Sequence, residues 1–451
     1  MLPRTRAIAC LVVFACLAAP TVAQERFTLD VMRRVVGVAS PQVSPDGKTV
    51  AIVVTRPNYT DNRTESELYA VDVATGVSRP LTFERHSVAE PRWSPDGSRL
   101  AFLAPCVTVG VWLQLVDGPP RRLDLGDLVV AGSYGYEITV SRSGAIFVVA
   151  TSTNRPAELY VMERPAWKPR RLTDFNAWAA SVSWATMERV TWTGPDNFNE
   201  DGVLVLPPQY SQSKSYPLVL LIHGGPNAAS KISFSAQAQL MAAEGWVIFM
   251  PNYRGSDNLG NTYYASIVGD WGRGPGRDVM AGVAEIRKRP YIDRARTAVT
   301  GWSYGGYMST WLLGNYPDEW KVGVAGAPVT NFEEEYNLSD GNVMWRYAFG
   351  GSPWTKGLAA KFREQSPITY ATNIKAPTLV MSNMEDFRVP PTQAFALYHA
   401  LKDNGVETEF IGFEGRTHAS SDPVNARERL RLWIDWVGRH IEKGASAKPG
   451  R

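Results

Sequence analysis

The chain has 451 residues, which is enough for two domains because a single hydrophobic core rarely grows beyond about 250 to 300 residues. Its 47 lysines and arginines nearly balance its 44 aspartates and glutamates, so its charge favours neither a nucleic acid nor a membrane surface as partner. The three cysteines are too few for a thiol-rich metal site, and we expect no metal or other cofactor.

The first 23 residues resemble an export signal, with two arginines, an apolar centre and small residues at 21–23. We expect cleavage before Gln24 and a secreted or periplasmic protein. A membrane anchor is the alternative, but Pro20 and the polar residues from Gln24 leave fewer than the roughly 20 apolar residues of a membrane span. A lipidated Cys16 is a further alternative. After cleavage only Cys106 remains, so the mature chain can form no internal disulfide.

Between about residues 38 and 175, short β runs alternate with turn signals. The sequence Ser-Pro-Asp-Gly occurs at 44–47 and 94–97, each time before an apolar run, and Pro-Asp-Gly favours a turn between two strands. A degenerate third copy from Val140 keeps its glycine, Gly144, in register with a period near 50 residues. This period, with about four strands per unit, is typical of β-propeller blades. A β-sandwich with chance turns is the alternative.

From about residue 200, near-continuous apolar runs alternate with helical stretches, which predicts a parallel sheet covered by helices on both faces. We expect strands at 218–222, 246–250, 298–301, 322–325, 378–381 and 409–413, and helices at 278–289, 304–315, 391–404 and 423–441.

The predicted class is therefore an α/β domain preceded by a short, propeller-like all-β domain of about three blades. The predicted organisation is a signal peptide at 1–23, a partial propeller at 24–195, the α/β domain at 196–443, which the motifs below assign to the α/β-hydrolases, and a disordered tail at 444–451.

Residues 301–305, Gly-Trp-Ser-Tyr-Gly, match the pattern G-x-S-x-G between an expected strand and an expected helix. In that setting the central serine lies on a strained turn with its hydroxyl exposed above the sheet, so Ser303 is the candidate nucleophile. A serine hydroxyl needs a nearby base that is oriented by a carboxylate. His418 follows the last expected strand, where a parallel sheet carries its functional loops, and Asp386 follows the strand before it. The order Ser303, Asp386, His418 is that of α/β-hydrolases.

The stretch His223-Gly224-Gly225-Pro226 resembles the loop that supplies an oxyanion-hole amide in such enzymes. We expect Gly225 and the Tyr304 N–H to stabilise a developing oxyanion. A glycine turn before a helix is the alternative.

Six motifs together resemble the prolyl oligopeptidase family of serine peptidases, in which a β-propeller precedes an α/β-hydrolase domain. They are HGGP at His223, NYRGS at Asn252, GDWG at Gly269, GWSYGGYM at Gly301, DFRVPPTQ at Asp386 and GRTH at Gly415. The resemblance implies peptide substrates and assigns nucleophile, acid and base to Ser303, Asp386 and His418. Gly306 is shared with the acylaminoacyl-peptidase and dipeptidyl-peptidase-like branches. Asn383, where the family usually has glycine, and the short propeller are departures.

The resemblance also implies substrate-binding residues. Arg388 looks like the family residue that contacts a substrate carbonyl, and the acidic loop 333–335 matches a loop that lines the pocket for the residue before the cut. Glu334 and Glu335 are therefore candidates, with a solvated acidic loop as the alternative.

The main functional interpretation is an exported serine peptidase that acts on short peptides. An esterase or lipase, or a catalytically silent propeller that binds partners, are the alternatives. We also expect association into a homo-oligomer, because three blades leave open sheet edges. We expect these edges to be rich in apolar residues such as Val50, Ile52, Val148 and Val149.

Overall fold

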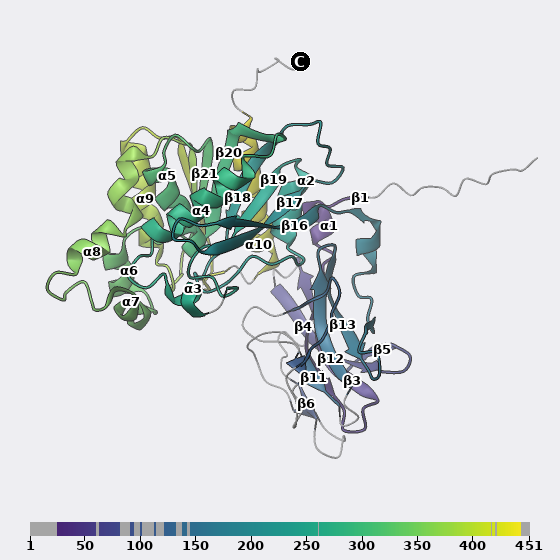
Figure 1. Cartoon of the computed structure of the whole chain (residues 1–451). Helices are drawn as coiled ribbons and strands as arrows, with labels where there is room; N and C mark the ends of the chain where they lie inside the picture. The colour runs from purple at the N-terminus through teal and green to yellow at the C-terminus, as the bar shows by residue number, and fades with distance from the viewer. Residues whose placement is uncertain are drawn as a thin grey trace, which may run out of the picture.

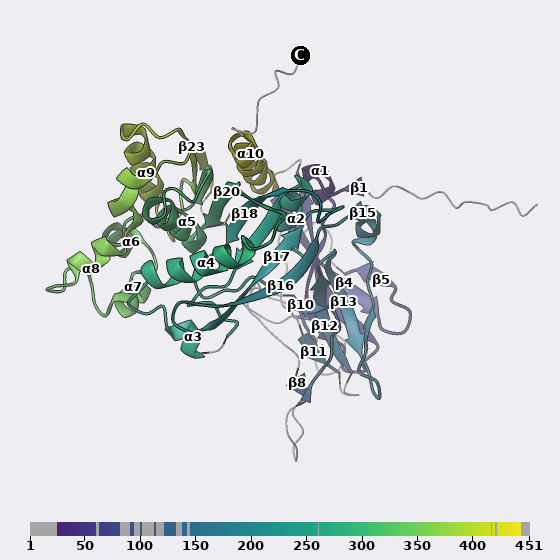
Figure 2. The same cartoon turned by 45° about the horizontal axis from the view of Figure 1, so that its top comes forward.

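A computed structural model of the chain describes residues 25–59, 63–81, 91–93, 100–101, 112–113, 121–131, 138–141, 145–259, 261–415, 417–419 and 422–442. The expected signal peptide and tail, Cys16, Cys106, the turn at 94–97 and Gly144 lie outside these residues. Figure 1 and Figure 2 show two parts of the chain, antiparallel sheets in purple and blue beside a larger domain of helices around a sheet.

The N-terminal part contains antiparallel sheets built from the sequence repeats. One sheet contains β2 (Gly37–Val43), β3 (Thr49–Asn58), β4 (Arg63–Asp72) and β5 (Ser78–Pro80). Another contains β10 (Val129–Val130), β11 (Ile138–Val140), β12 (Ile146–Ser152), β13 (Arg155–Met162) and β14 (Pro169–Arg171). Two short pairs join β6 (Arg92–Trp93) to β7 (Leu100–Ala101) and β8 (Trp112–Leu113) to β9 (Arg121–Arg122). Most of the second repeat lies outside the described residues.

The two larger sheets share a core to which β2, β3, β4, β12 and β13 contribute. The expectation that Val50, Ile52, Val148 and Val149 lie at open edges is wrong, because β3 and β12 are inner strands and all four side chains are fully buried. The outer strands β5 and β14 have three residues each and contain a proline, which limits pairing with another chain.

The first described residues pack on the larger domain. β1 (Glu25–Arg26) pairs in parallel with β15 (Val182–Ser183), which follows η1 (Ala177–Ser181). Phe27, between β1 and α1 (Leu29–Met32), lies 4.6 Å from Trp184 between ring centroids, and its cluster includes Leu240 and Leu430 of the larger domain. Burial of this aromatic cluster joins residues 25–32 to the larger domain. The sequence had placed these residues in the all-β domain.

The larger domain is built on an eight-stranded sheet of order β16-β17-β19-β18-β20-β21-β22-β23. Its strands are β16 (Thr186–Thr193), β17 (Asn199–Leu206), β18 (Tyr216–Ile222), β19 (Val247–Pro251), β20 (Ile292–Trp302), β21 (Val322–Gly326), β22 (Thr378–Asn383) and β23 (Thr408–Phe413). The strands from β18 to β23 are parallel, whereas β16 and β17 extend the sheet by antiparallel pairing. The expected boundary at residue 196 falls between β16 and β17.

Helices cover both faces of this sheet (Figure 1). They are α2 (Ala236–Ala243), α3 (Asn261–Ala265), α4 (Arg273–Ile286), α5 (Tyr304–Asn315), α6 (Phe332–Leu338), α7 (Asn342–Phe349), α8 (Ala359–Glu364), η2 (Pro367–Asn373), α9 (Pro391–Asp403) and α10 (Pro423–Ile441). Successive residues of β18 alternate between the core under α4, α5 and α9 and the core under α2 and α10. Among the described residues, no helix is both long and apolar enough to cross a membrane.

A buried charged cluster joins α4 to the antiparallel side of the sheet. The Arg254 guanidinium donates to both carboxylate oxygens of Asp278, at 2.7 Å each. The neighbouring Glu200 on β17 is fully buried and accepts a 2.6 Å hydrogen bond from the Trp192 indole. Burial, aided by the Asp278 carboxylate, raises the pKa of Glu200 to about 9. We therefore expect Glu200 to be protonated at neutral pH.

Glu200→Gln should weaken the dependence of stability on alkaline pH. Since folding raises the pKa of Glu200, its contribution to the free energy of unfolding is complete below the ordinary value of 4.5 and is lost as pH rises toward about 9. Between pH 7 and pH 9, the parent Tm should fall by at least roughly 3 °C more than the variant Tm. Glu188→Gln is the control, because Glu188 is an exposed acid of β16, and its Tm should fall with pH as steeply as that of the parent. Equal slopes for parent and Glu200→Gln would contradict the assignment.

Candidate active site

The turn between β20 and α5 places Ser303 in a backbone conformation with a positive φ. Its φ is 63° and its ψ is −125°, and its N–H donates to the Gly326 carbonyl of β21 at 2.9 Å. A positive φ is uncommon for residues other than glycine and is costly unless the surroundings hold it. The strand, the turn and the helix therefore keep Ser303 at the carboxyl edge of the sheet.

Glycines flank this serine because their neighbours come too close for a side chain. A Cβ atom at Gly301 would lie well inside contact distance of the Gly305 carbonyl group. A Cβ atom at Gly305 would likewise collide with the carbonyl oxygen of Ile222 at the end of β18. The G-x-S-x-G pattern is thus a packing requirement of a helix that begins directly beside two strands.

Asp386 and His418 come from the loops after β22 and β23 and meet in a hydrogen bond. His418 Nδ1 lies 2.7 Å from Asp386 Oδ2, and the other oxygen of Asp386 accepts from the N–H groups of Arg388 and Val389 at 2.8 and 3.0 Å. A carboxylate accepts the Nδ1 proton, which leaves Nε2 as the acceptor of a neutral imidazole. His418 Nε2 is buried, and no described residue forms a hydrogen bond with it. The imidazole is therefore equipped to take a proton.

Two further bonds hold the histidine loop against the strands. Asn383, the last residue of β22, donates from its side chain to the Thr417 carbonyl at 2.6 Å, and the Trp302 indole donates to the His418 carbonyl at 3.1 Å. In the sequence, Asn383 is distinguished only as a departure from the family pattern. Its positioning role could have been inferred from the sequence, because it is a polar residue at the end of a buried strand, three residues before Asp386.

A cavity of about 120 Å³ brings most of the predicted residues together. Its lining includes Ser303, His418, Gly225, Tyr304, Arg388 and Glu335. The rest is apolar or aromatic: Tyr307, Val329, Phe332, Met344, Trp345 and Val389.

The glycine turn after β18 passes directly beside the serine. A Cβ atom at Gly224 would lie 3.8 Å from Ser303 Oγ. His223 holds this turn, with Nδ1 2.8 Å from the Gly224 carbonyl and Nε2 3.0 Å from Ser256 Oγ. Burial lowers the pKa of His223 to about 4, so the ring is neutral, and the carbonyl partner assigns its proton to Nδ1. These contacts fix the backbone that leads to Gly225.

The acidic stretch is a helix and not the expected loop. Asn331 caps α6 by accepting from the N–H groups of Glu333 and Glu334. Glu335 is fully buried and lines the cavity, whereas Glu334 is partly exposed and is not part of the lining. Only Glu335 is therefore placed to meet a substrate.

Arg388 lies at the cavity with an exposed side chain. Its guanidinium pairs with Asp340 through Nε to Oδ1 at 2.6 Å and Nη2 to Oδ2 at 3.3 Å. This ion pair orients the arginine beside the opening.

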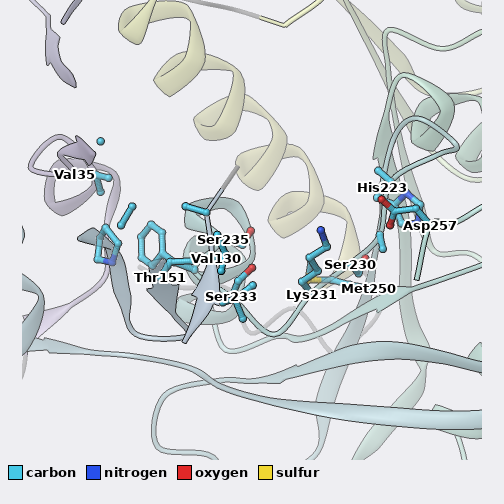
Figure 3. A pocket seen from close by; sticks show the side chains of 18 of the residues that line it. Val35, Val130, Thr151, His223, Ser230, Lys231, Ser233, Ser235, Met250 and Asp257 are labelled. Atoms are coloured by element: carbon cyan, nitrogen blue, oxygen red, sulfur yellow. The ribbon is translucent and has the colours of Figure 1, made fainter. Parts of the chain in front are cut away.

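A second cavity, of about 490 Å³, lies between the all-β part and the larger domain (Figure 3). Val35, Val130 and Thr151 line it from one part, and Lys231 and His223 from the other. Since His223 borders this cavity and Gly225 borders the smaller one, the glycine turn separates the two. Among the described residues, no group of histidine, cysteine or carboxylate side chains could hold a metal ion.

Comparisons with known proteins match this architecture. The prolyl oligopeptidase family model matches residues 232–444. The dipeptidyl-peptidase 5 of Porphyromonas gingivalis is 29% identical over 414 residues, which are 89% of this chain and 59% of the relative. The acylamino-acid-releasing enzyme of Mus musculus is 27% identical over 459 residues, 85% of this chain and 62% of that enzyme. A solved acylaminoacyl peptidase in complex with Z-Gly-Gly-Phe-chloromethyl ketone superposes with a TM-score of 0.78 at 18% identity, covering 94% of this chain and 99% of that one.

The fold is thus an α/β-hydrolase domain preceded by propeller-like sheets, as predicted from the sequence. Residues 232–444, which form most of the hydrolase domain, match the model of the prolyl oligopeptidase family. The chain spans 59% and 62% of the lengths of the two relatives named above.

Gly305→Ala should destabilise the domain, because the added methyl group meets the Ile222 carbonyl at the junction of β18 and α5. Overpacking of this kind costs about 3 kcal/mol, so we expect thermal melting at least about 5 °C below the parent. Gly438→Ala in α10 is the control, because its nearest neighbour, an atom of Trp246, would lie at an ordinary 3.7 Å. An unchanged Tm for Gly305→Ala would show that the turn has room for a side chain.

Proposed function

We propose that this protein is a serine peptidase that hydrolyses short peptides through an acyl-enzyme on Ser303. The observation that carries the proposal is the 2.7 Å bond between His418 and Asp386, with His418 Nε2 left as an acceptor in the cavity that contains Ser303. The match of residues 232–444 to the prolyl oligopeptidase family model supports peptide bonds as the target, as do relatives named as a dipeptidyl-peptidase and an acylamino-acid-releasing enzyme.

The proposed reaction begins with attack of Ser303 Oγ on the scissile carbonyl carbon while His418 Nε2 accepts the hydroxyl proton. The Tyr304 N–H and the Gly225 N–H stabilise the oxyanion, and Asp386 stabilises the imidazolium. His418 then donates the proton to the leaving amine, and the C–N bond breaks. Water, activated by the same imidazole, hydrolyses the acyl ester and restores Ser303.

The peptide is proposed to extend from the small cavity toward the larger one. The turn 223–225 borders both, and the larger cavity is lined by polar residues that include Ser230, Lys231 and Asp257 (Figure 3). With this assignment, the residue before the cut occupies the small cavity beside Ser303, and the all-β part contacts the remainder.

We also propose that the enzyme acts outside the cytoplasm. The support is the signal-like composition of residues 1–23, which lie outside the described part of the chain. Sequencing the N-terminus of the protein recovered from its native host tests the proposal, and the expected first residue is Gln24. Recovery of a chain that begins at Met1 would contradict it.

Ser303→Ala should lower kcat for a chromogenic peptide by about 10⁴-fold or more, because alanine lacks the hydroxyl oxygen that attacks the scissile carbonyl. A fluorophosphonate probe should label the parent at Ser303, as mapped by mass spectrometry. The chain offers an internal comparison in Ser256, which also contacts a histidine but is fully buried and lies outside the small cavity. Labelling at Ser256, or undiminished turnover by Ser303→Ala, would refute the assignment.

Asp386→Asn should lower kcat by about 10⁴-fold with little change in KM, because an amide favours the wrong imidazole tautomer. The exposed Asp403→Asn at the end of α9 is the charge-matched control and should retain parent kinetics. Steady-state kinetics on one chromogenic peptide measures both variants. A kcat within tenfold of the parent would mean that Asp386 does not orient the base.

A further inference from the structure

The cavity beside Ser303 contains one buried carboxyl group that the proposed reaction does not use. Glu335, on α6, is fully buried, and its Oε2 accepts a 2.9 Å hydrogen bond from the Gln393 side chain. Its other oxygen, Oε1, is also buried and forms no hydrogen bond with any described residue. Leaving a buried acceptor without a partner is costly, so this oxygen points to a ligand group that supplies a donor.

The surroundings of Glu335 suit a long side chain that ends in a cation. Tyr307, Phe332 and Trp345 contribute aromatic rings to the cavity, and Val329 contributes an apolar wall. Aliphatic stems pack well on such surfaces, and aromatic faces attract lysine and arginine heads. The pocket thus joins an apolar passage to a buried carboxyl group.

The groups around Glu335 compensate its negative charge only in part. Ser339 and Trp345 lie close enough to favour the ionised form, as does the Arg388 charge, whereas Asp386 disfavours it. Burial outweighs these effects and raises the pKa of Glu335 to about 8. The Arg388 guanidinium pairs with Asp340, and no cationic side chain in the described ranges forms an ion pair with Glu335.

We propose that Glu335 selects a basic side chain at the residue before the cut, so that the enzyme cleaves after lysine or arginine. This inference rests on the proposed peptidase function. A cation in the cavity gives Oε1 the donor that it lacks and a charge partner in a desolvated site, where such pairs discriminate strongly. An apolar residue of the same length fills the passage but leaves Oε1 unpaired.

The test uses two chromogenic peptides that are identical except for lysine or norleucine before the cut. Norleucine keeps the aliphatic stem of lysine and lacks its ammonium group. The ratio of kcat/KM for lysine over norleucine should exceed about 10 in the parent, and Glu335→Gln should lower it by between about 10-fold and 100-fold. Glu333→Gln is the matched control, because Glu333 lies on the same helical turn but pairs with Arg363 on the surface, and it should keep the parent ratio.

The dependence of this ratio on pH separates a charge partner from a structural role. Binding an ammonium group requires the ionised carboxyl, so the parent ratio should rise as pH increases through about 8 and then level off. Lysine itself stays charged over this range. An effect of pH on the catalytic step is common to both peptides and cancels in the ratio. Glu335→Gln should show no such rise.

Binding of the same two peptides to Ser303→Ala measures the pocket without turnover. A parent that cleaves neither peptide would refute the proposed peptidase function, while tighter binding of the lysine peptide would still support the pocket assignment. A parent ratio near one, or a ratio that Glu335→Gln leaves unchanged, would overturn the role of Glu335, as would equal binding of the two peptides. A variant that is less stable but keeps the parent ratio would show that Glu335 serves only the packing of α6.

Discussion

The strained backbone of Ser303 is the constraint on which the rest of the site depends. Ser303 is the single residue between the end of β20 and the start of α5, so the chain has no loop in which to relax a φ of 63°. The Gly326 carbonyl holds the turn from β21, and Gly305 lets the helix approach the end of β18. The elbow is therefore a product of three neighbouring strands, and the position of its hydroxyl is set by the packing of the whole sheet.

The same sheet explains why residues far apart in the chain meet at this hydroxyl. Asp386 and His418 follow β22 and β23, whose carboxyl ends lie at the same edge as the end of β20. Parallel strands collect their outgoing loops at one edge, which is where open α/β sheets place their sites. Asn383 and Trp302 then tie the histidine loop to that edge, so the geometry does not depend on the acid–base contact alone.

The sequence predicted those parts of the fold that a local pattern encodes. The runs at 322–325 and 378–381 are apolar because both faces of their strands are covered, and the structure has β21 and β22 there. The helix at 304–315 is present with the predicted bounds. β16 was not predicted, because an edge strand with mostly exposed side chains lacks the apolar run.

Long-range packing accounts for the rest. Val50 and Val149 were assigned to open edges because a repeat count does not show which strands lie inside a sheet. Glu334 and Glu335 were both expected in a loop, but they lie on the helix α6. Because successive residues of a helix point in different directions, Glu335 lines the cavity and Glu334 does not. The aromatic cluster around Phe27 depends on residues more than 100 positions away, which no local pattern reveals.

The covalent intermediate on Ser303 is the central claim, and rapid quenching of the enzyme with an activated peptide ester tests it most directly. The account predicts a burst of about one leaving group per enzyme and a matching increase in intact mass, because acylation precedes hydrolysis. Peptide mapping should then place the acyl group on Ser303. Steady release from the first turnover without a mass increase, or an acyl group on any other residue, would contradict the account.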